Sequence, residues 1–146
     1  MQEERLALLF LRITNALKKD INSRMEQLGL TGSQCMVLEY INKSPNGTLT
    51  QKDIELHFDL KHPTVSGILK RLERNGFVLS SCNEDDRRYK NITMTEKAHA
   101  VMEKVKAGQA IREKIIAQGL SKQEIAALRE TLNTVLDNLV DKRGVN

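Results

Sequence analysis

The chain has 146 residues, of which 40% are apolar, 29% charged and only 3% aromatic, which predicts a folded protein of roughly one domain with a real core. No apolar run approaches the ~20 residues of a membrane-spanning helix, and the acidic start at Glu3 and Glu4 does not suit a signal peptide, so we expect a cytoplasmic protein. The net charge of +4 is gathered in residues 61–90, which carry seven basic and four acidic side chains, whereas residues 31–60 carry two and four.

The first thirty residues predict one long amphipathic helix that ends at Gly29. Apolar side chains recur every three or four positions, which places them on one face of a helix. These side chains are Leu6, Leu9, Phe10, Ile13, Leu17, Ile21, Met25 and Leu28. Thr31 and Gln34 then fit a capping box, in which each side chain bonds the other residue's backbone N–H, at the start of a short helix through Ile41.

The next segment predicts two short helices joined by a tight connection. Residues 45–47 are typical of a turn, and Thr50 can cap a helix over residues 51–58. After a connection at residues 59–61, Pro63 suits the first turn of the second helix, because its missing N–H donor costs nothing there. The inward-facing stripe of this helix is Val65, Ile68, Leu69 and Leu72, and Asn75-Gly76 supplies its stop.

Two strands and two long helices complete the expected fold. Residues 77–79 and 90–94 predict a β-hairpin around a polar turn at residues 83–88. Thr95 can cap a long helix that has Gly108 as a weak point in its middle. Ser121 and Glu124 form a second capping box. It precedes a coiled-coil-like seam of Ile125, Leu128, Leu132, Val135 and Leu139.

Two short helices followed by a hairpin make a winged helix-turn-helix, whose second helix is sized for the major groove of DNA. Outside its inward stripe, this helix has small groups in its first half and cations in its second. They are His62, Pro63, Thr64, Ser66, Gly67, Lys70, Arg71 and Arg74. Gly67 costs ~1 kcal/mol in a helix, which the close approach of another surface would justify. The alternative is a solvated basic face on an ordinary helix.

The hairpin turn carries Asp86, Arg87 and Arg88. An arginine at a hairpin tip can enter the minor groove, where narrow A·T-rich stretches concentrate negative potential. Asp86 is placed to hold the guanidinium of Arg88 through a charge-assisted hydrogen bond. The alternative is an exposed turn with an ordinary surface ion pair.

Three segments resemble the MarR family of bacterial transcriptional regulators: residues 60–78 (LKHPTVSGILKRLERNGFV), the turn at residues 86–88 (DRR) and residues 92–97 (ITMTEK). The resemblance covers essentially the whole chain, and the R-L-E-x-x-G-F and D-x-R motifs are fairly specific together. It implies a single MarR-like chain, residues 1–146, that is mainly α with a small β-hairpin wing. A winged helix-turn-helix lobe, residues 33–95, would be flanked by helical dimerisation regions, residues 1–30 and 96–146.

The resemblance also implies a homodimer that binds a palindromic operator in double-stranded DNA, usually as a repressor released by a small molecule or an oxidant. Residues 62–74 would read the groove, and Arg88 would be the wing arginine braced by Asp86. The expected DNA contacts are Ser33, Gln51, His62, Pro63, Thr64, Ser66, Gly67, Lys70, Arg71, Arg74, Asp86, Arg87 and Arg88. His62, Thr64 and Ser66 would touch bases, and the cations and the donors near Ser33 and Gln51 would hold phosphates.

The apolar seams of the first and last helices independently predict a homodimer, because a lone winged lobe offers them too little partner surface. The alternative is that both helices pack only on their own chain. Related proteins bind phenolic ligands beside the dimer helices, which suggests a small aromatic or amphipathic effector here. Its pocket would be lined by Phe10, Ile13, Leu17, Met36 and Tyr40, unless these residues are plain core.

A redox-sensing repressor is a further alternative, because Cys35 lies in the first turn of a helix, where the helix dipole can lower the pKa of a thiol. The simpler interpretation is that Cys35 and Cys82 are small core or strand residues. They form no C-x-x-C pair and the three histidines are scattered, so we expect no disulfide scaffold, no metal site and no cofactor.

Other functional classes are less well supported by the sequence. It has no phosphate-cradling glycine loop and no G-x-S-x-G motif, so we expect no enzyme. Few aromatic side chains are present to stack on RNA bases. The main rival is a winged helix that docks an acidic protein partner.

Overall fold

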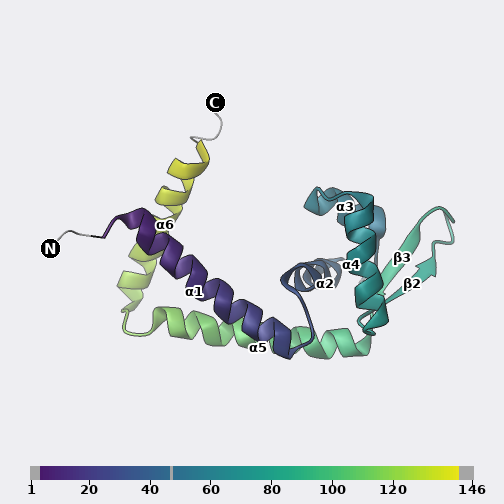
Figure 1. Cartoon of the computed structure of the whole chain (residues 1–146), viewed down its shortest axis with the longest axis horizontal. Coiled ribbons are helices and arrows are strands. Elements are labelled where there is room, and N and C mark those ends of the chain that lie inside the picture. The colour runs from purple at the N-terminus through teal and green to yellow at the C-terminus, as the bar shows by residue number, and fades with distance from the viewer. Residues whose placement is uncertain (1–3, 47, 142–146) are drawn as a thin grey trace. The chain divides into compact units, whose positions relative to one another are not determined.

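The structure, a computed structural model, describes residues 4–46 and 48–141 and is mainly helical with a small antiparallel sheet (Figure 1). This confirms the predicted fold class. In chain order the elements are α1 (Leu6–Gln27), α2 (Gly32–Lys43), β1 (Thr48–Thr50), α3 (Gln51–Phe58), α4 (His62–Arg74), β2 (Val78–Cys82), β3 (Lys90–Met94), α5 (Glu96–Ala117) and α6 (Lys122–Asp141). The chain divides into two compact units, one up to Ala107 and one from Gly108 onward.

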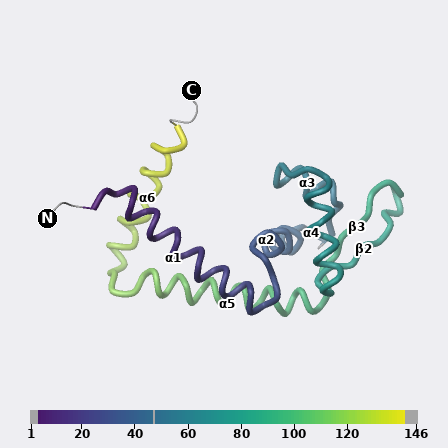
Figure 2. The backbone as a smooth tube through the Cα atoms, in the orientation of Figure 1, coloured from purple at the N-terminus to yellow at the C-terminus, as the bar shows by residue number. Residues whose placement is uncertain are grey.

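The core of the first unit runs from Met25, near the end of α1, to Val105 of α5. Most of its side chains come from α2, α3, α4, β2 and β3, which lie together in the backbone trace of Figure 2. The predicted inward stripe of α4 is confirmed, because Val65, Ile68, Leu69 and Leu72 are all buried. They pack with fully buried side chains of the other elements, among them Leu38, Ile41, Ile54, Val78 and Ile92. One face of α4 is therefore committed to the core and the opposite face is left outside.

The sheet has three strands in the order β1-β3-β2, and both pairings are antiparallel. The predicted two-stranded hairpin was therefore incomplete, since Leu49 of β1 pairs with Ile92 of β3. Strand β2 also starts one residue later and runs further than predicted, with Cys82 opposite Lys90. Pairing with β3 draws two serines, which have little strand preference of their own, into the ladder.

Both predicted capping boxes and the predicted stop after α4 are confirmed, whereas α1 runs from Leu6 to Gln27 and not over the first thirty residues. Thr31 Oγ1 accepts from Gln34 N–H at 3.2 Å, and Gln34 Oε1 accepts from Thr31 N–H at 3.1 Å, so the capping box is present. The second predicted box is also present, with Ser121 N–H donating to Glu124 Oε2 at 2.7 Å. Gly76 has a φ of +77°, the left-handed conformation that the stop after α4 requires. Gly47 of the predicted 45–47 turn lies outside the described residues.

The apolar stripes of α1 and α6 are not covered by the units that contain them. Within α1, Met25 is buried, whereas Leu6, Leu9 and Ile13 are 42–70% exposed. In α6, all of whose residues are described, no side chain is buried, and the exposed leucines include Leu128, Leu132 and Leu139. Each unit therefore presents a long apolar helix face to its surroundings.

Among the helices of the described residues, none combines the length and the apolar character needed to cross a bilayer. Within residues 4–46 and 48–141, no three His, Cys, Asp or Glu side chains are grouped so that they could hold a metal ion.

Candidate nucleic-acid interface

The outer face of α4 carries the side chains that the sequence assigns to DNA. Thr64, Lys70, Arg71 and Arg74 are exposed, and Ser66 is half-buried. Arg71 and Arg74 lie in the last turn of the helix, where the partial negative charge of the helix end favours cations. The helix thus offers small polar groups at its start and positive charge at its end.

Gly67 lies on this outer face and has no packing reason to be glycine. A Cβ built there would meet no described atom within 4 Å, apart from its chain neighbours and the backbone of its own helix. No contact within the described part of the chain therefore requires glycine at this position. Gly67 borders an open cleft of about 470 Å³, lined by Thr31, Ser33, Gln34, Pro63, Thr64, Gly67, Ile68 and Arg71.

This cleft brings together predicted contacts that are distant in sequence. Ser33, at the start of α2, and Thr64 and Arg71, on α4, line the same hollow. The first backbone N–H groups of a helix have no partner within the helix and attract anions. The start of α2 and the cation of Arg71 thus border the same hollow.

His62, the first residue of α4, is held by two side chains of α3. Its Nδ1 lies 2.6 Å from Oε1 of Glu55 and 3.0 Å from Nε2 of Gln51. Gln51 also donates from Nε2 to the backbone oxygen of His62 at 3.4 Å. The structure therefore places the predicted base contact His62 and the predicted phosphate contact Gln51 against each other. Glu55, which the sequence analysis missed, completes the cluster.

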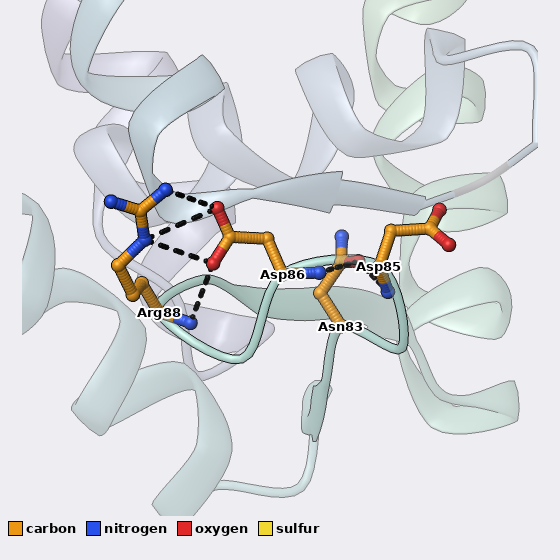
Figure 3. Close-up of polar contacts among 4 residues, drawn as sticks. All are labelled: Asn83, Asp85, Asp86 and Arg88. Atoms are coloured by element: carbon orange, nitrogen blue, oxygen red, sulfur yellow. Dashed lines mark hydrogen bonds and ion pairs between the residues drawn. The ribbon is translucent and has the colours of Figure 1, made fainter.

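The hairpin turn holds Arg88 in the predicted way (Figure 3). Arg88 donates from Nη2 to Asp86 Oδ2 at 2.7 Å, and from Nε to Oδ1 at 3.0 Å and to Oδ2 at 3.2 Å. Its backbone N–H also donates to Asp86 Oδ1. Asn83 Oδ1 accepts from the backbone N–H groups of Asp85 and Asp86, which shapes the turn itself. The guanidinium is thus fixed while the Arg88 side chain remains 82% exposed.

The ion pair also sets the charges at this tip. The hydrogen bonds from Arg88 lower the pKa of Asp86, and the bond to Asp86 raises the pKa of Arg88. The pKa of Asp86 is lower in the folded protein than in the unfolded chain. The ion pair therefore stabilises the turn fully above the unfolded-state pKa, and this stabilisation is lost as the pH falls through the folded-state pKa. At neutral pH the turn therefore presents an intact pair, with the exposed Arg87 beside it.

The wing is tied to the end of α4 by residues at the start of α5. Thr95 donates from Oγ1 to the backbone oxygen of Gly76 at 2.6 Å. Lys97 donates from Nζ to the backbone oxygen of Asn75 at 2.7 Å and lies 4.7 Å from the ring centroid of Phe77. These contacts join α4, β2 and α5 at one point. The wing and α4 can therefore act as one rigid surface.

A family model described as "MarR family" matches residues 28–88, which hold α2 to α4 and the wing up to Arg88. Over these residues the chain is similar to the MarR family. The uncharacterized HTH-type transcriptional regulator YwoH of Bacillus subtilis (strain 168) is 35% identical to this chain over 89 residues. That match covers 61% of this chain and 63% of YwoH, which is less than two thirds of the relative's length.

Two further similarities extend over more of the chain. The uncharacterized HTH-type transcriptional regulator YfiV of the same organism is 29% identical over 133 residues, which are 90% of this chain and 81% of YfiV. The crystal structure of an S. aureus MepR–DNA complex is similar with a TM-score of 0.78 and 28% identity, covering 91% of this chain and 98% of that one.

The predicted effector pocket stays a prediction. Met36 and Ile13 are 55% and 48% exposed, so for these two the alternative of plain core is wrong. Phe10, Leu17 and Tyr40 are half-buried. The ring of Tyr40 is stacked on that of His57, with centroids 3.8 Å apart. A shallow hollow on α1 takes in Ile13, and its other lining residues are Leu9, Arg12, Asn15 and Ala16.

The expectation of a thiol made acidic by the helix dipole is wrong for Cys35. Burial of the side chain, and next the negative charge of Glu39 one turn along α2, raise the pKa of Cys35 to about 11. The start of the helix favours the thiolate, but the loss of solvent favours the thiol more strongly. Cys82 is an exposed free thiol at the end of β2.

We therefore expect iodoacetamide at pH 7.5 to alkylate Cys82 in the native protein and to modify Cys35 only after unfolding. The attacking species is the thiolate, which is scarce at a group whose pKa is about 11 and which burial also shields. Mass spectrometry of tryptic peptides measures both sites in one sample. Cys35→Ser is the control for peptide assignment. Rapid alkylation of Cys35 in the native protein would contradict this prediction and favour the redox-sensing repressor.

Proposed function

We propose that this chain is a MarR-family, sequence-specific regulator of transcription that binds double-stranded DNA. The observation that carries the proposal is the exposed Arg88, fixed by Asp86 at the tip of a wing that is tied to α4. A flexible surface arginine pays conformational entropy when it binds, and a braced one has already lost that freedom. The likeness to MepR, whose structure is that of a DNA complex, supports the same function.

In the proposed complex the outer face of α4 enters the major groove. His62, Thr64 and Ser66 would contact base edges, and Gly67 would let the helix approach closely. Lys70, Arg71, Arg74 and the donors near Ser33 and Gln51 would hold phosphates. Phosphate contacts supply affinity and its salt dependence, whereas base contacts supply sequence preference.

The wing would reach the neighbouring minor groove. Arg88 would insert there, with Asp86 keeping its guanidinium in place and Arg87 beside it. A narrow A·T-rich minor groove has the most negative potential, so an arginine at this position favours such sequence without reading individual bases. We accordingly expect A·T base pairs on the outer flanks of each half-site.

We further propose a homodimer, because α1 and α6 present apolar faces that their own units do not cover. Leaving such leucines in water costs ~1.5–3 kcal/mol each relative to full burial. Two subunits related by a two-fold axis would place the two α4 helices in successive major grooves, and the matching operator is a palindrome.

The biological role in this proposal is a cytoplasmic repressor that a small aromatic or amphipathic effector releases from its operator. The predicted pocket residues lie on α1 and α2, and α2 also contributes Ser33 and Gln34 to the cleft beside α4. A ligand that moved α2 would therefore alter the surface that meets DNA.

Selection of bound duplexes from random double-stranded DNA tests the proposal. We expect recovery of a palindrome whose half-sites are centred about one helical turn, 10–10.5 bp, apart. Recovery of unrelated sequences at moderate salt would contradict it. Such a result would favour the rival function, in which the basic helix docks an acidic protein.

A further inference from the structure

A buried carboxylate of α3 contacts the first residue of α4. Glu55 is 8% exposed, and its Oε1 lies 2.6 Å from Nδ1 of His62, whose side chain is 74% exposed. A buried carboxylate is costly unless it is paired and hydrogen-bonded. The burial of Glu55 therefore favours any conformation in which His62 turns Nδ1 toward it.

The position of Glu55 is itself fixed by the end of α3. Its backbone oxygen accepts from the N–H groups of Asp59 and Leu60, and Asp59 takes a left-handed conformation with a φ of 50°. Gln51 lies one turn earlier on α3 and donates to the backbone oxygen of His62. Two turns of α3 thus hold both the main chain and the ring of the residue that begins α4.

The contacts of Nδ1 decide which ring nitrogen carries the proton. Nδ1 either donates its one hydrogen or accepts with its one lone pair. The carboxylate of Glu55 can only accept, whereas the amide nitrogen of Gln51 can only donate. The bond to Glu55 is the shorter of the two and is charge-assisted. Nδ1 therefore donates to Glu55, and Gln51 uses the backbone oxygen of His62 instead.

This arrangement determines what the exposed edge of the ring can recognise. With the hydrogen on Nδ1, Nε2 of a neutral imidazole is a hydrogen-bond acceptor. In the major groove, the hydrogen-bond donors on base edges are the N6 amino group of adenine and the N4 amino group of cytosine. Nε2 in this form matches those two bases and does not match the acceptor edge of guanine.

We propose that Glu55 is a specificity-determining positioning residue: it fixes the imidazole of His62 in the Nδ1–H form, so that Nε2 accepts from an adenine or cytosine amino group of the operator. The inference rests on the proposed function, because it assumes that His62 faces a base. It adds a residue that does not itself contact DNA.

The tautomer is measured in the free protein by nitrogen-15 NMR of the imidazole ring. We expect the Nδ1–H pattern for His62 in the wild type and its loss in Glu55→Met, which keeps the chain length but removes the acceptor. Glu73→Met, an exposed carboxylate of α4, is the matched control and should leave the His62 signals unchanged. An Nε2–H pattern in the wild type, or an unchanged pattern in Glu55→Met, would overturn the proposal.

The consequence for DNA is measured as the ratio of Kd for a scrambled duplex to Kd for the selected operator. We expect this ratio to fall about a hundredfold in Glu55→Met, because the hydrogen bond is lost in both half-sites and one good hydrogen bond is worth about tenfold. Glu55→Gln, which keeps an acceptor oxygen, should retain most of the wild-type Kd ratio. In a His62→Ala background the Glu55 substitution should have no further effect, as a double-mutant cycle requires.

The outcomes separate the inference from the proposed function. A wild type that prefers no sequence contradicts the proposed function. A wild-type preference that Glu55→Met retains in full contradicts the inference alone. If Glu55→Met does not fold, as circular dichroism would show, operators in which single adenines or single cytosines are replaced by analogues that lack the exocyclic amino group supply the test. The wild type should lose about tenfold in affinity at one such position and His62→Ala should lose nothing there; equal losses in both proteins, or none, would overturn the proposal.

Discussion

Replacing Arg88 with alanine should raise the Kd for the operator about a hundredfold, because both wings of a dimer lose their minor-groove contact and each contact contributes about tenfold. The fold should not change, since the Arg88 side chain is 82% exposed and its partner Asp86 lies in the same turn. Fluorescence anisotropy of a labelled operator at fixed salt gives the Kd. Thermal unfolding followed by circular dichroism checks the fold.

Two variants separate the wing contact from a general loss of charge. Lys104→Ala removes one positive charge from an exposed position on α5 and should change the Kd by no more than about twofold. Asp86→Asn keeps Arg88 but weakens the ion pair that holds its guanidinium. The Kd of this variant for the operator should therefore lie between those of the wild type and Arg88→Ala. An Arg88→Ala protein with unchanged affinity and an unchanged salt slope would show that the wing does not reach the DNA.

Replacing Leu132 with glutamate should convert the dimer to a monomer at micromolar concentration and abolish tight operator binding. Leu132 is 42% exposed on the uncovered apolar face of α6. In a two-fold interface the substitution removes two apolar contacts and adds two charges. We expect the dimer dissociation constant to rise at least about a hundredfold, on the basis of ~1.5 kcal/mol or more for each leucine. Sedimentation velocity measures the change.

Asn133→Glu is the matched control, because it adds the same charge to the next position of α6, outside the predicted seam. It should remain a dimer. A wild type that sediments as a monomer at micromolar concentration, or a Leu132→Glu variant that stays a dimer, would remove dimerisation through α6 from the account.

Local sequence signals predicted most of the winged lobe. The buried stripe of α4 follows from the spacing of four apolar residues, and the capping boxes at Thr31 and Ser121 follow from two side chains three positions apart. The Asp86–Arg88 pair joins residues two positions apart in one turn. In each case the interacting groups are close in sequence, so a local sequence pattern is enough to predict the contact.

Features that depend on packing between elements could not be predicted in the same way. Strand β1 has three residues, too few to show an alternating pattern, and its last residue Thr50 also caps α3. The Glu55–His62 contact needs the geometry of the turn between α3 and α4. Position in a helix suggested an acidic Cys35, but burial, which the sequence does not give, raises its pKa instead.

The candidate DNA-binding residues and their roles were predicted from the sequence, but the contacts between residues of different elements were not. The sequence placed His62 on the outer face of α4, and the structure shows that two residues of α3 hold it there. Ser33 and Arg71 were assigned to phosphates separately, and the structure places them on one cleft. The structure therefore groups a list of polar residues into two clusters of neighbouring side chains.

The central claim is that matching basic helices and braced arginine wings recognise a duplex at a fixed spacing. The most direct test is the affinity of the purified protein for its selected palindrome and for a scrambled duplex, measured across a range of salt concentrations. The account predicts that the palindrome binds at least about a thousandfold more tightly at physiological salt, and that a clear preference persists as salt rises. Equal affinity for the two duplexes, with all binding lost as salt rises, would contradict it.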